Sequence, residues 1–225
     1  IPETMPRSTA GAGRPTKEPS LPLLSWLKQM RAQWGLLLRD SEVRAALGIN
    51  CAAWFAHAGA NMTLLPLMLA GGQLALSPAQ IGSVFAAQSA LNLLLTGPAA
   101  SATDRFGPGN VIAPSLAMTT VAIALFPLAE DLMQASAVLA LWTAGGSLLS
   151  SAPTVMAANH VAPEARSQAL AMVRTVGDLG LLAGATSVGL AATAFGAGPA
   201  MQGTAALLGT VTSGYFARQM LRRAA

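Results

Sequence analysis

Long stretches without any charged side chain constrain this protein more than any other feature of its sequence. No Asp, Glu, Lys or Arg occurs at residues 45–103, 106–129, 132–163 or 179–217. A helix that crosses roughly 30 Å of hydrocarbon needs about 20 mostly apolar residues, so each stretch can hold a complete span. Only 10% of the chain is charged, against about a quarter in soluble domains. The sequence therefore predicts a multi-pass integral membrane protein surrounded by lipid.

The residues that interrupt these stretches predict an all-α bundle of six transmembrane helices. Gly, Pro and acidic residues, which commonly mark helix ends, lie between the apolar runs. Strands of a membrane barrel would alternate polar and apolar residues, and these runs are apolar at both phases. The expected spans are 45–70, 79–102, 110–129, 132–157, a fifth helix from Ala162-Pro163-Glu164 to about 193, and 198–217.

The chain divides into three segments on this interpretation. Residues 1–43 are expected to be a cytoplasmic linker, 44–217 a six-helix transmembrane repeat, and 218–225 a basic cytoplasmic tail. The linker begins with a Pro-rich stretch that cannot bury a core, and residues 21–44 have a basic amphipathic pattern that suits the membrane surface. Because the chain begins at Ile1 and not at Met, we expect a fragment of a longer protein.

The basic residues predict the orientation of the spans. With six spans, one side of the membrane holds twelve of the thirteen Lys and Arg residues, and the exception is Arg174 inside the fifth span. The loops on the other side contain only the acidic pair Glu130 and Asp131. Since Lys and Arg concentrate in cytoplasmic loops, both ends of the chain are predicted to be cytoplasmic.

Several classes of function are not supported by the sequence. The pI is near 10.2, but the basic residues flank the spans instead of covering one soluble face, so no nucleic acid partner is expected. A single cysteine, Cys51, excludes a thiolate metal cluster or a disulfide framework. No paired metal ligands, phosphate-binding loop or nucleophile elbow is present, so we expect neither an enzyme nor a cofactor or metal.

Three segments contain motifs of a known family of proteins. Residues 98–107 (PAASATDRFG) resemble the G-x-x-x-D-R-x-G loop of the major facilitator superfamily, which joins the second and third helices of a repeat. Residues 61–66 (NMTLLP) through 76–82 (LSPAQIG) are similar to its seventh helix and the following loop. Residues 163–169 (PEARSQA), with 174–180 (RTVGDLG) and Gly184, resemble the tenth-to-eleventh helix region of drug-proton antiporter relatives.

The resemblance implies a fold and a function. The chain would be the C-terminal six-helix half of a twelve-helix transporter, and the N-terminal six-helix half would be its partner. It would move a small solute by alternating access, with protons as the second substrate. Asp104, Arg105 and Gly107 would belong to the D-R-x-G loop of the family. In that loop, the Asp104–Arg105 pair either makes a contact that holds one conformational state or caps the end of the helix.

Arg174 and Asp178 are the most informative charged residues. They are four residues apart in the fifth span, so they can reach each other on one helix face. A charge near the bilayer centre costs on the order of 3 kcal/mol or more unless it is paired or hydrated. The pair is therefore expected to avoid lipid, either as a site for proton coupling and substrate charge or as a structural ion pair.

Polar side chains recur at helical spacing on two other spans. Asn50, Trp54, His57 and Asn61 form a stripe on the first span, and Gln88 and Asn92 form a pair on the second. The stripe suits a water-filled cavity, or alternatively hydrogen bonds between helices. His57 can exchange a proton near neutral pH, but a lone histidine inside a membrane span is more often a hydrogen-bonded packing residue.

Glycines in the fifth span predict close helix contacts. Gly177, Gly180 and Gly184 remove side chains from one region of the helix, which lets a neighbouring backbone approach. Such contacts serve packing, or the sliding of helices during alternating access.

Two alternatives to an active half-transporter remain at this stage. One is a truncated or degenerate half without activity of its own. The other is a six-helix membrane enzyme or assembly protein.

Overall fold

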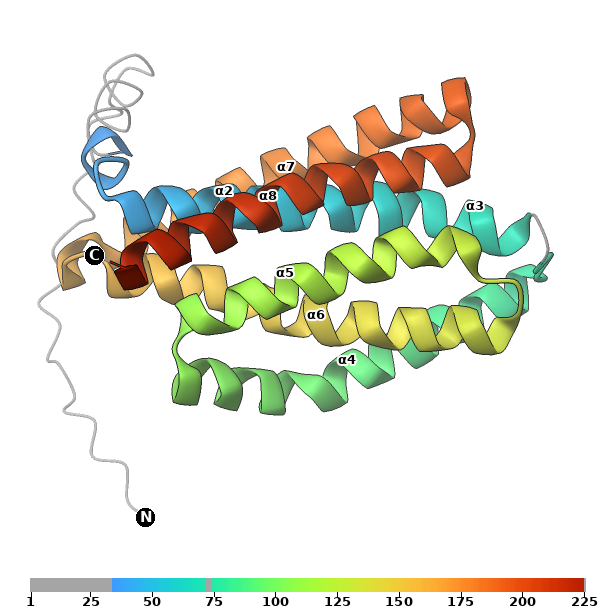
Figure 1. The fold of residues 1–225 in the computed structure, drawn as a ribbon, viewed down its shortest axis with the longest axis horizontal. Helices are drawn as coiled ribbons and strands as arrows, with labels where there is room; N and C mark the ends of the chain where they lie inside the picture. The colour runs from blue at the N-terminus through green and yellow to red at the C-terminus, as the bar shows by residue number, and fades with distance from the viewer. Residues whose placement is uncertain (1–33, 72–73, 225) are drawn as a thin grey trace, which may run out of the picture.

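Helices that run in alternating directions form a single bundle in the part of the chain that the structure describes. The computed structural model describes residues 34–71 and 74–224. Every regular element within these ranges is a helix, which confirms the all-α prediction, and consecutive long helices run in opposite directions (Figure 1). The predicted Pro-rich linker and most of the predicted surface segment lie outside the described residues.

The helical segments follow one another closely. The α-helices are α2 (Ser41–Ala56), α3 (Leu65–Ala70), α4 (Pro78–Phe106), α5 (Pro108–Leu125), α6 (Leu132–Asn159), α7 (Arg166–Phe195) and α8 (Ala197–Ala224). A π-helix, η1 (His57–Leu64), joins α2 to α3, and two short 3-10 turns are η2 (Phe126–Leu128) and η3 (Pro163–Ala165). Residues 218–224, predicted as a tail, continue helix α8.

Local chemistry explains where these helices begin and end. The Asp40 carboxylate accepts hydrogen bonds from the backbone N–H groups of Glu42 and Val43, at 2.6 and 3.2 Å, and so caps α2. Ser77 and Gln80 form a reciprocal capping box at the start of α4. Gly107 ends α4 with a φ of +78°, a left-handed conformation that favours glycine.

The first long helical run contains an eight-residue π segment. Pro66 lies just after η1 and has no backbone N–H to donate to the preceding turn. Within η1, the Thr63 hydroxyl donates to the carbonyl of Ala58, five residues back, at 2.9 Å. The wider π turn therefore places the side chains of His57–Leu64 differently from those of a regular α-helix.

Three helical segments of the described chain are long and apolar enough, by length and composition, to cross a membrane: Pro108–Leu128, Leu132–Asn159 and Pro163–Phe195. The other predicted spans, 45–70, 79–102 and 198–217, also lie on helices. The first of these is divided by η1.

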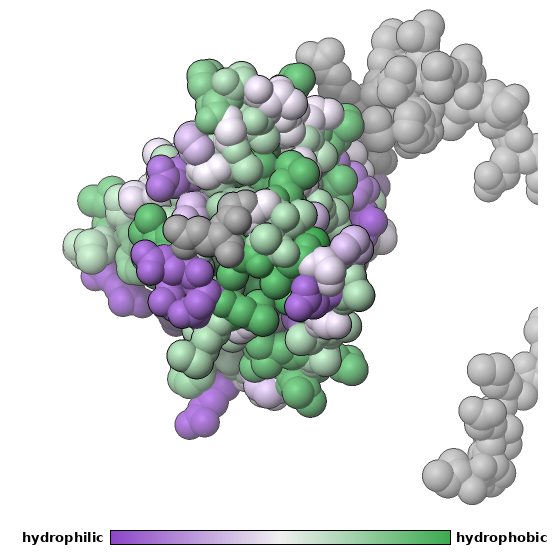
Figure 2. All heavy atoms as spheres, turned by 90° about the vertical axis from the view of Figure 1, so that its right-hand side faces the viewer, coloured by the Kyte–Doolittle hydropathy of each residue, from purple (hydrophilic) through white to green (hydrophobic). Residues whose placement is uncertain are grey.

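The core lies between α2, α5, α6 and α8, whereas α4 and α7 form the edges of the bundle. Fully buried side chains include Leu64, Ile112, Leu116, Ile123, Met156, Met172, Met201 and Leu208. Helix α4 buries only Ala99 and Thr103 among its 29 residues. Figure 2 views the bundle from the end near α3, and apolar side chains reach the outer edge of the molecule there. This surface suits contact with hydrocarbon or with further helices.

Charged side chains gather at the opposite end of the bundle. Glu42, at the start of α2, pairs with Arg218 at 2.7 Å and with Arg222, both near the end of α8. Arg223 donates to the Asn110 side chain at 2.8 Å, which ties the same end of α8 to α5. These bonds hold α8 against α2 and α5.

Helix α7 packs on α2 through its three predicted packing glycines. A Cβ atom at Gly180 or Gly184 would lie well under 3.0 Å from the backbone carbonyl of Cys51 or Phe55, respectively. At Gly177 it would meet the Asn50 and Trp54 side chains. The contacts at Gly180 and Gly184 are with backbone atoms of α2. Backbone atoms cannot rotate aside as a flexible side chain can, so a larger residue at either position would push the helices apart.

We predict that Gly180→Ala destabilises the bundle. Overpacking of this kind costs about 1–3 kcal/mol, which exceeds the roughly 1 kcal/mol that Ala gains in helix propensity. Thermal unfolding in detergent should therefore show a lower midpoint. Gly189→Ala is the matched control on the same helix, since its Cβ would meet only the Thr63 methyl group at 3.7 Å. Equal midpoints for the two variants would contradict the prediction.

Candidate functional site

A polar cavity of about 400 Å³ lies between α2, η1, α4, α5 and α6. Aromatic, amide and hydroxyl side chains surround it, and among its lining residues only His57 has an acid–base side chain. The lining residues are Ala53, Trp54, His57, Asn61, Phe85, Gln88, Ser89, Asn92, Thr119, Trp142, Thr143, Gly146, Leu149 and Ser150.

The wall formed by α2 and η1 carries Trp54, His57 and Asn61. The Trp54 and His57 rings meet edge to face, with centroids 5.6 Å apart at an angle of 87°. Asn61 is only 5% exposed, and within the described residues its amide makes no hydrogen bond to the protein. Within the described residues no buried side-chain N or O atom lacks a hydrogen-bond partner. The Asn61 amide atoms are therefore accessible from the cavity, where they can bond to water or to a ligand.

The wall formed by α4 carries Gln88 and Asn92. The Ser147 hydroxyl of α6 donates to the Asn92 side-chain oxygen at 2.7 Å, which links α4 to α6. The Gln88 amide has no protein partner in the described part of the chain and remains available to an occupant. The structure therefore brings His57, Asn61, Gln88 and Asn92 together around one space.

Asn50 lies elsewhere, although it belongs to the same predicted stripe. Its amide donates to the backbone carbonyl of Val173 on α7 at 2.8 Å, and the side chain is 4% exposed. The stripe is thus divided, because α7 covers the face of α2 at Asn50 while the cavity opens further along, at Trp54 and His57.

Arg174 and Asp178 form an ion pair outside the cavity. The Arg174 Nε donates to Asp178 Oδ2 at 3.2 Å, and the two side chains are 76% and 58% exposed. They lie on the face of α7 turned away from α2, where the neighbouring Leu179 and Leu182 are also exposed. The pair therefore occupies an outer surface of the bundle.

The predicted loop residues lie where α4 ends. The Gly107 N–H donates to the Thr103 carbonyl at 3.0 Å, and the Arg105 guanidinium lies 5.5 Å from the centroid of the Phe106 ring. Neither Asp104 nor Arg105 makes an ion pair within residues 34–71 and 74–224. Gly107 fits the turn because of its positive φ.

Residues of α5 and α6 complete the cavity, and the sequence pattern did not single them out. Trp142, Thr143 and Ser150 come from α6, and Thr119 comes from α5. A polar face was visible in α6, where Thr143, Ser147 and Ser150 are spaced three or four residues apart. That spacing could have indicated a polar face on α6, but it does not show which neighbouring helix this face packs against.

The lining determines the chemistry that the cavity supports. No Asp, Glu, Lys or Arg lines it, and within the described residues no group of three His, Cys, Asp or Glu could hold a metal ion. Amides, hydroxyls and imidazole offer hydrogen bonds, while Trp54, Phe85 and Trp142 offer aromatic surface. The site is suited to reversible binding of a small polar or amphipathic molecule.

Apolar helices around a polar cavity are the architecture of a membrane transport protein. The sequence profile of the Major Facilitator Superfamily matches residues 46–220, and the chain belongs to this family. Members of the family are membrane transporters, and the chain is an integral membrane protein. A comparison with curated proteins found no match.

Cysteine labelling should distinguish the cavity from the core. In a Cys51→Ala background, Gln88→Cys and His57→Cys are expected to react with a charged, water-soluble methanethiosulfonate. Ser115→Cys, at a position that is 0% exposed, serves as the buried control. Because only a thiolate in contact with water reacts, we expect rates about tenfold or more higher at the cavity positions. Similar rates at all three positions would contradict a hydrated cavity.

Proposed function

We propose that this chain is the C-terminal half of a secondary active transporter that moves a small solute by alternating access, coupled to protons. The observation that carries the proposal is a cavity in an apolar bundle of this family, where the amides of Asn61 and Gln88 make no hydrogen bond to the described protein and face the same space as His57. A structural core would satisfy or remove such groups. A transport site keeps them for its substrate.

The six long helical runs are proposed to be six membrane spans. Consecutive runs alternate in direction, and the turns near Arg105 and Arg166 lie at the same end as Glu42 and Arg218. The opposite end carries Glu130 and Asp131. The excess of arginine at one end supports a cytoplasmic location for that end and for both ends of the chain.

An N-terminal six-helix half is proposed to cover the exposed faces of α4 and α7. Arg174 and Asp178 are exposed on α7, and lipid would disfavour both charges. A second half placed over this face would enclose the ion pair and complete the central pathway. The other partners of the chain on this proposal are the lipid bilayer, the solute and protons.

Asp178 is the proposed coupling residue, with Arg174 as its charge partner. Protonation of Asp178 would release the 3.2 Å ion pair, so the charge on this face of α7 would change with each proton bound. His57 is the second proton-carrying candidate, because it lines the cavity. Asp104 and Arg105 are proposed to make a charge contact that holds one conformational state.

We expect Asp178→Asn to abolish proton coupling in the assembled transporter. The Asn side chain does not exchange a proton as a carboxylate does, so gradient-driven flux should fall by about tenfold or more while membrane insertion is unchanged. The assay uses proteoliposomes that contain the pH-sensitive dye pyranine, so that proton flux is read from its fluorescence. The solute is an uncharged organic compound, chosen from a panel because the unmodified protein transports it when a pH gradient is applied. Asp178→Glu should keep coupling, and Thr175→Ala is a control on the same exposed face. Unchanged coupled flux in Asp178→Asn would remove Asp178 from the proposal.

Reporter tags test the number and direction of the spans. A fluorescent protein fused to either end of the chain should be protected from external protease in intact spheroplasts, because an even number of spans returns the chain to its starting side. A tag inserted between Glu130 and Asp131 should be accessible. Tags at the two ends that report opposite sides would disprove the six-span arrangement.

A further inference from the structure

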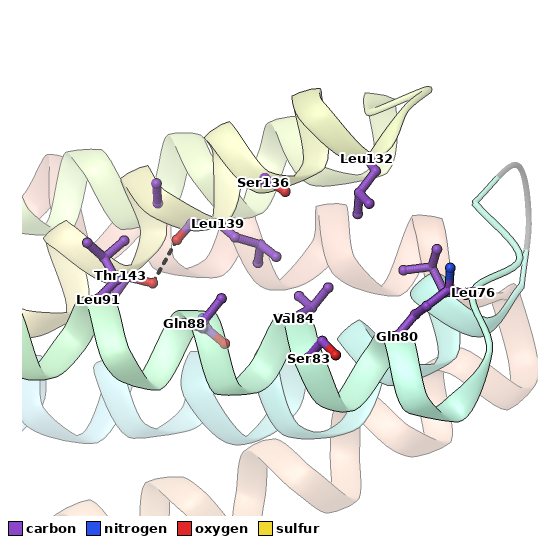
Figure 3. A pocket seen from close by; sticks show the side chains of 12 residues that line it. Leu76, Gln80, Ser83, Val84, Gln88, Leu91, Leu132, Ser136, Leu139 and Thr143 are labelled. Carbon is purple, nitrogen blue, oxygen red and sulfur yellow. Dashed lines mark hydrogen bonds between the residues drawn. The ribbon is translucent and has the colours of Figure 1, made fainter.

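A second hollow, of about 300 Å³, runs between α4 and α6 (Figure 3). Side chains of the two helices face each other across it, with Val84 and Gln88 on α4 opposite Leu139 and Thr143 on α6. It extends toward Leu76 and Leu132, at the end of the bundle that carries Glu130 and Asp131. We call this hollow the α4–α6 groove.

The α4–α6 groove presents an apolar surface although it contains polar residues. The hydroxyls of Ser83 and Thr143 donate to carbonyls of their own helices, at 3.0 and 2.7 Å. The side-chain oxygen of Gln80 accepts from the Ser77 N–H at 2.9 Å in the capping box. Ser136 and Gln88 are the polar lining residues whose side chains make no hydrogen bond within the described part of the chain. Most of the remaining surface is aliphatic and comes from Leu76, Val84, Ala87, Leu91, Leu132 and Leu139.

The groove and the polar cavity adjoin each other. Gln88 and Thr143 line both spaces, so the two meet at these side chains. On one side of Gln88 lie the unpartnered amide of Asn61 and the imidazole of His57. On the other side lies the aliphatic channel, which follows α4 for about 12 Å between Gln88 and Gln80.

We infer that the ligand of this site is an amphiphile with an uncharged polar head in the cavity and an aliphatic tail in the α4–α6 groove. The inference rests on the proposed function, because it takes the polar cavity as the substrate site. The head is uncharged because none of the lining residues of either space is Asp, Glu, Lys or Arg. The tail is aliphatic because most of the side chains that line the groove are aliphatic. Gln88 marks the junction between head and tail.

Photolabelling of the reconstituted chain tests this arrangement directly. The probe is 1-O-dodecylglycerol with a diazirine at the terminal carbon of the chain, added to the protein in phospholipid nanodiscs without any gradient. If the glycerol head occupies the cavity, the diazirine should attach to groove residues around Val84, Leu132 and Leu139. Unlabelled 1-O-dodecylglycerol should compete, whereas dodecane and glycerol, which each lack one half of the amphiphile, should not.

Filling the groove provides a matched pair of variants. Ala87 lines only the groove, so Ala87→Phe should block the tail and leave the cavity unchanged, and Ala140→Phe should do the same from α6. Each methylene that no longer fits weakens binding by about fourfold, so labelling should fall by about tenfold or more. Ala90→Phe places the same ring on α4 outside both spaces and should label as the unmodified protein does.

The outcomes separate this inference from the proposed function. Labelling confined to the exposed α4 positions Leu93 and Leu94, or labelling that Ala87→Phe and Ala140→Phe leave intact, would show simple partitioning into the bilayer and overturn the inference. Because the experiment uses no gradient, loss of coupled transport leaves its result unaffected. Conversely, a chain that transports but is not labelled in the groove would retain the proposed function and lose this ligand assignment.

Discussion

Hydrocarbon offers no hydrogen-bond partner, and this constraint organises the whole bundle. Buried hydroxyl groups donate to the carbonyl four residues back on their own helix, as Ser115 does at 2.6 Å and Thr204 at 2.9 Å. Polar side chains satisfied in this way can lie anywhere in the bundle. Asn61 and Gln88, whose amides make no hydrogen bond to the described protein, face the cavity instead. Amides open to this space can bond to water or to a solute.

The same bundle is tightly joined in one region and open in another. Helix α7 contacts the backbone of α2 through Gly180 and Gly184, and Glu42 fixes the end of α8. Helix α4, in contrast, buries only two residues, Ala99 and Thr103, and leaves both the cavity and the α4–α6 groove accessible along its length. The weakly packed helix is thus the one that borders the proposed ligand site, while the closely packed helices provide a rigid support.

Much of the fold could be predicted from local sequence signals. The capping residue Ser77, the positive-φ residue Gly107 and the capping residue Asp131 stand at helix ends within a few residues of the expected boundaries. The π-helix η1 was not predicted, because Pro66 alone is compatible with a kink or a regular first turn. The candidate site was predicted in part. His57, Asn61, Gln88 and Asn92 share the cavity, but the contribution of Trp142 and Ser150 depends on how α6 meets α4.

By itself, the sequence determined that the protein lies in lipid and that its spans are helical. Long uncharged runs without polar alternation can be read along the chain. A helix forms its backbone hydrogen bonds within its own segment, so no knowledge of neighbouring segments is needed. The tertiary structure alone decided which polar residues serve the site. Asn50 and His57 belong to the same polar stripe in the sequence, so the sequence does not show which of them faces the site. In the structure, α7 packs close to α2 through its glycines, and the Val173 carbonyl of α7 accepts a hydrogen bond from the Asn50 amide. His57 instead faces the cavity between α2, α4 and α6. Which neighbouring helix packs against each side chain depends on the tertiary structure, and the sequence of one helix does not contain that information.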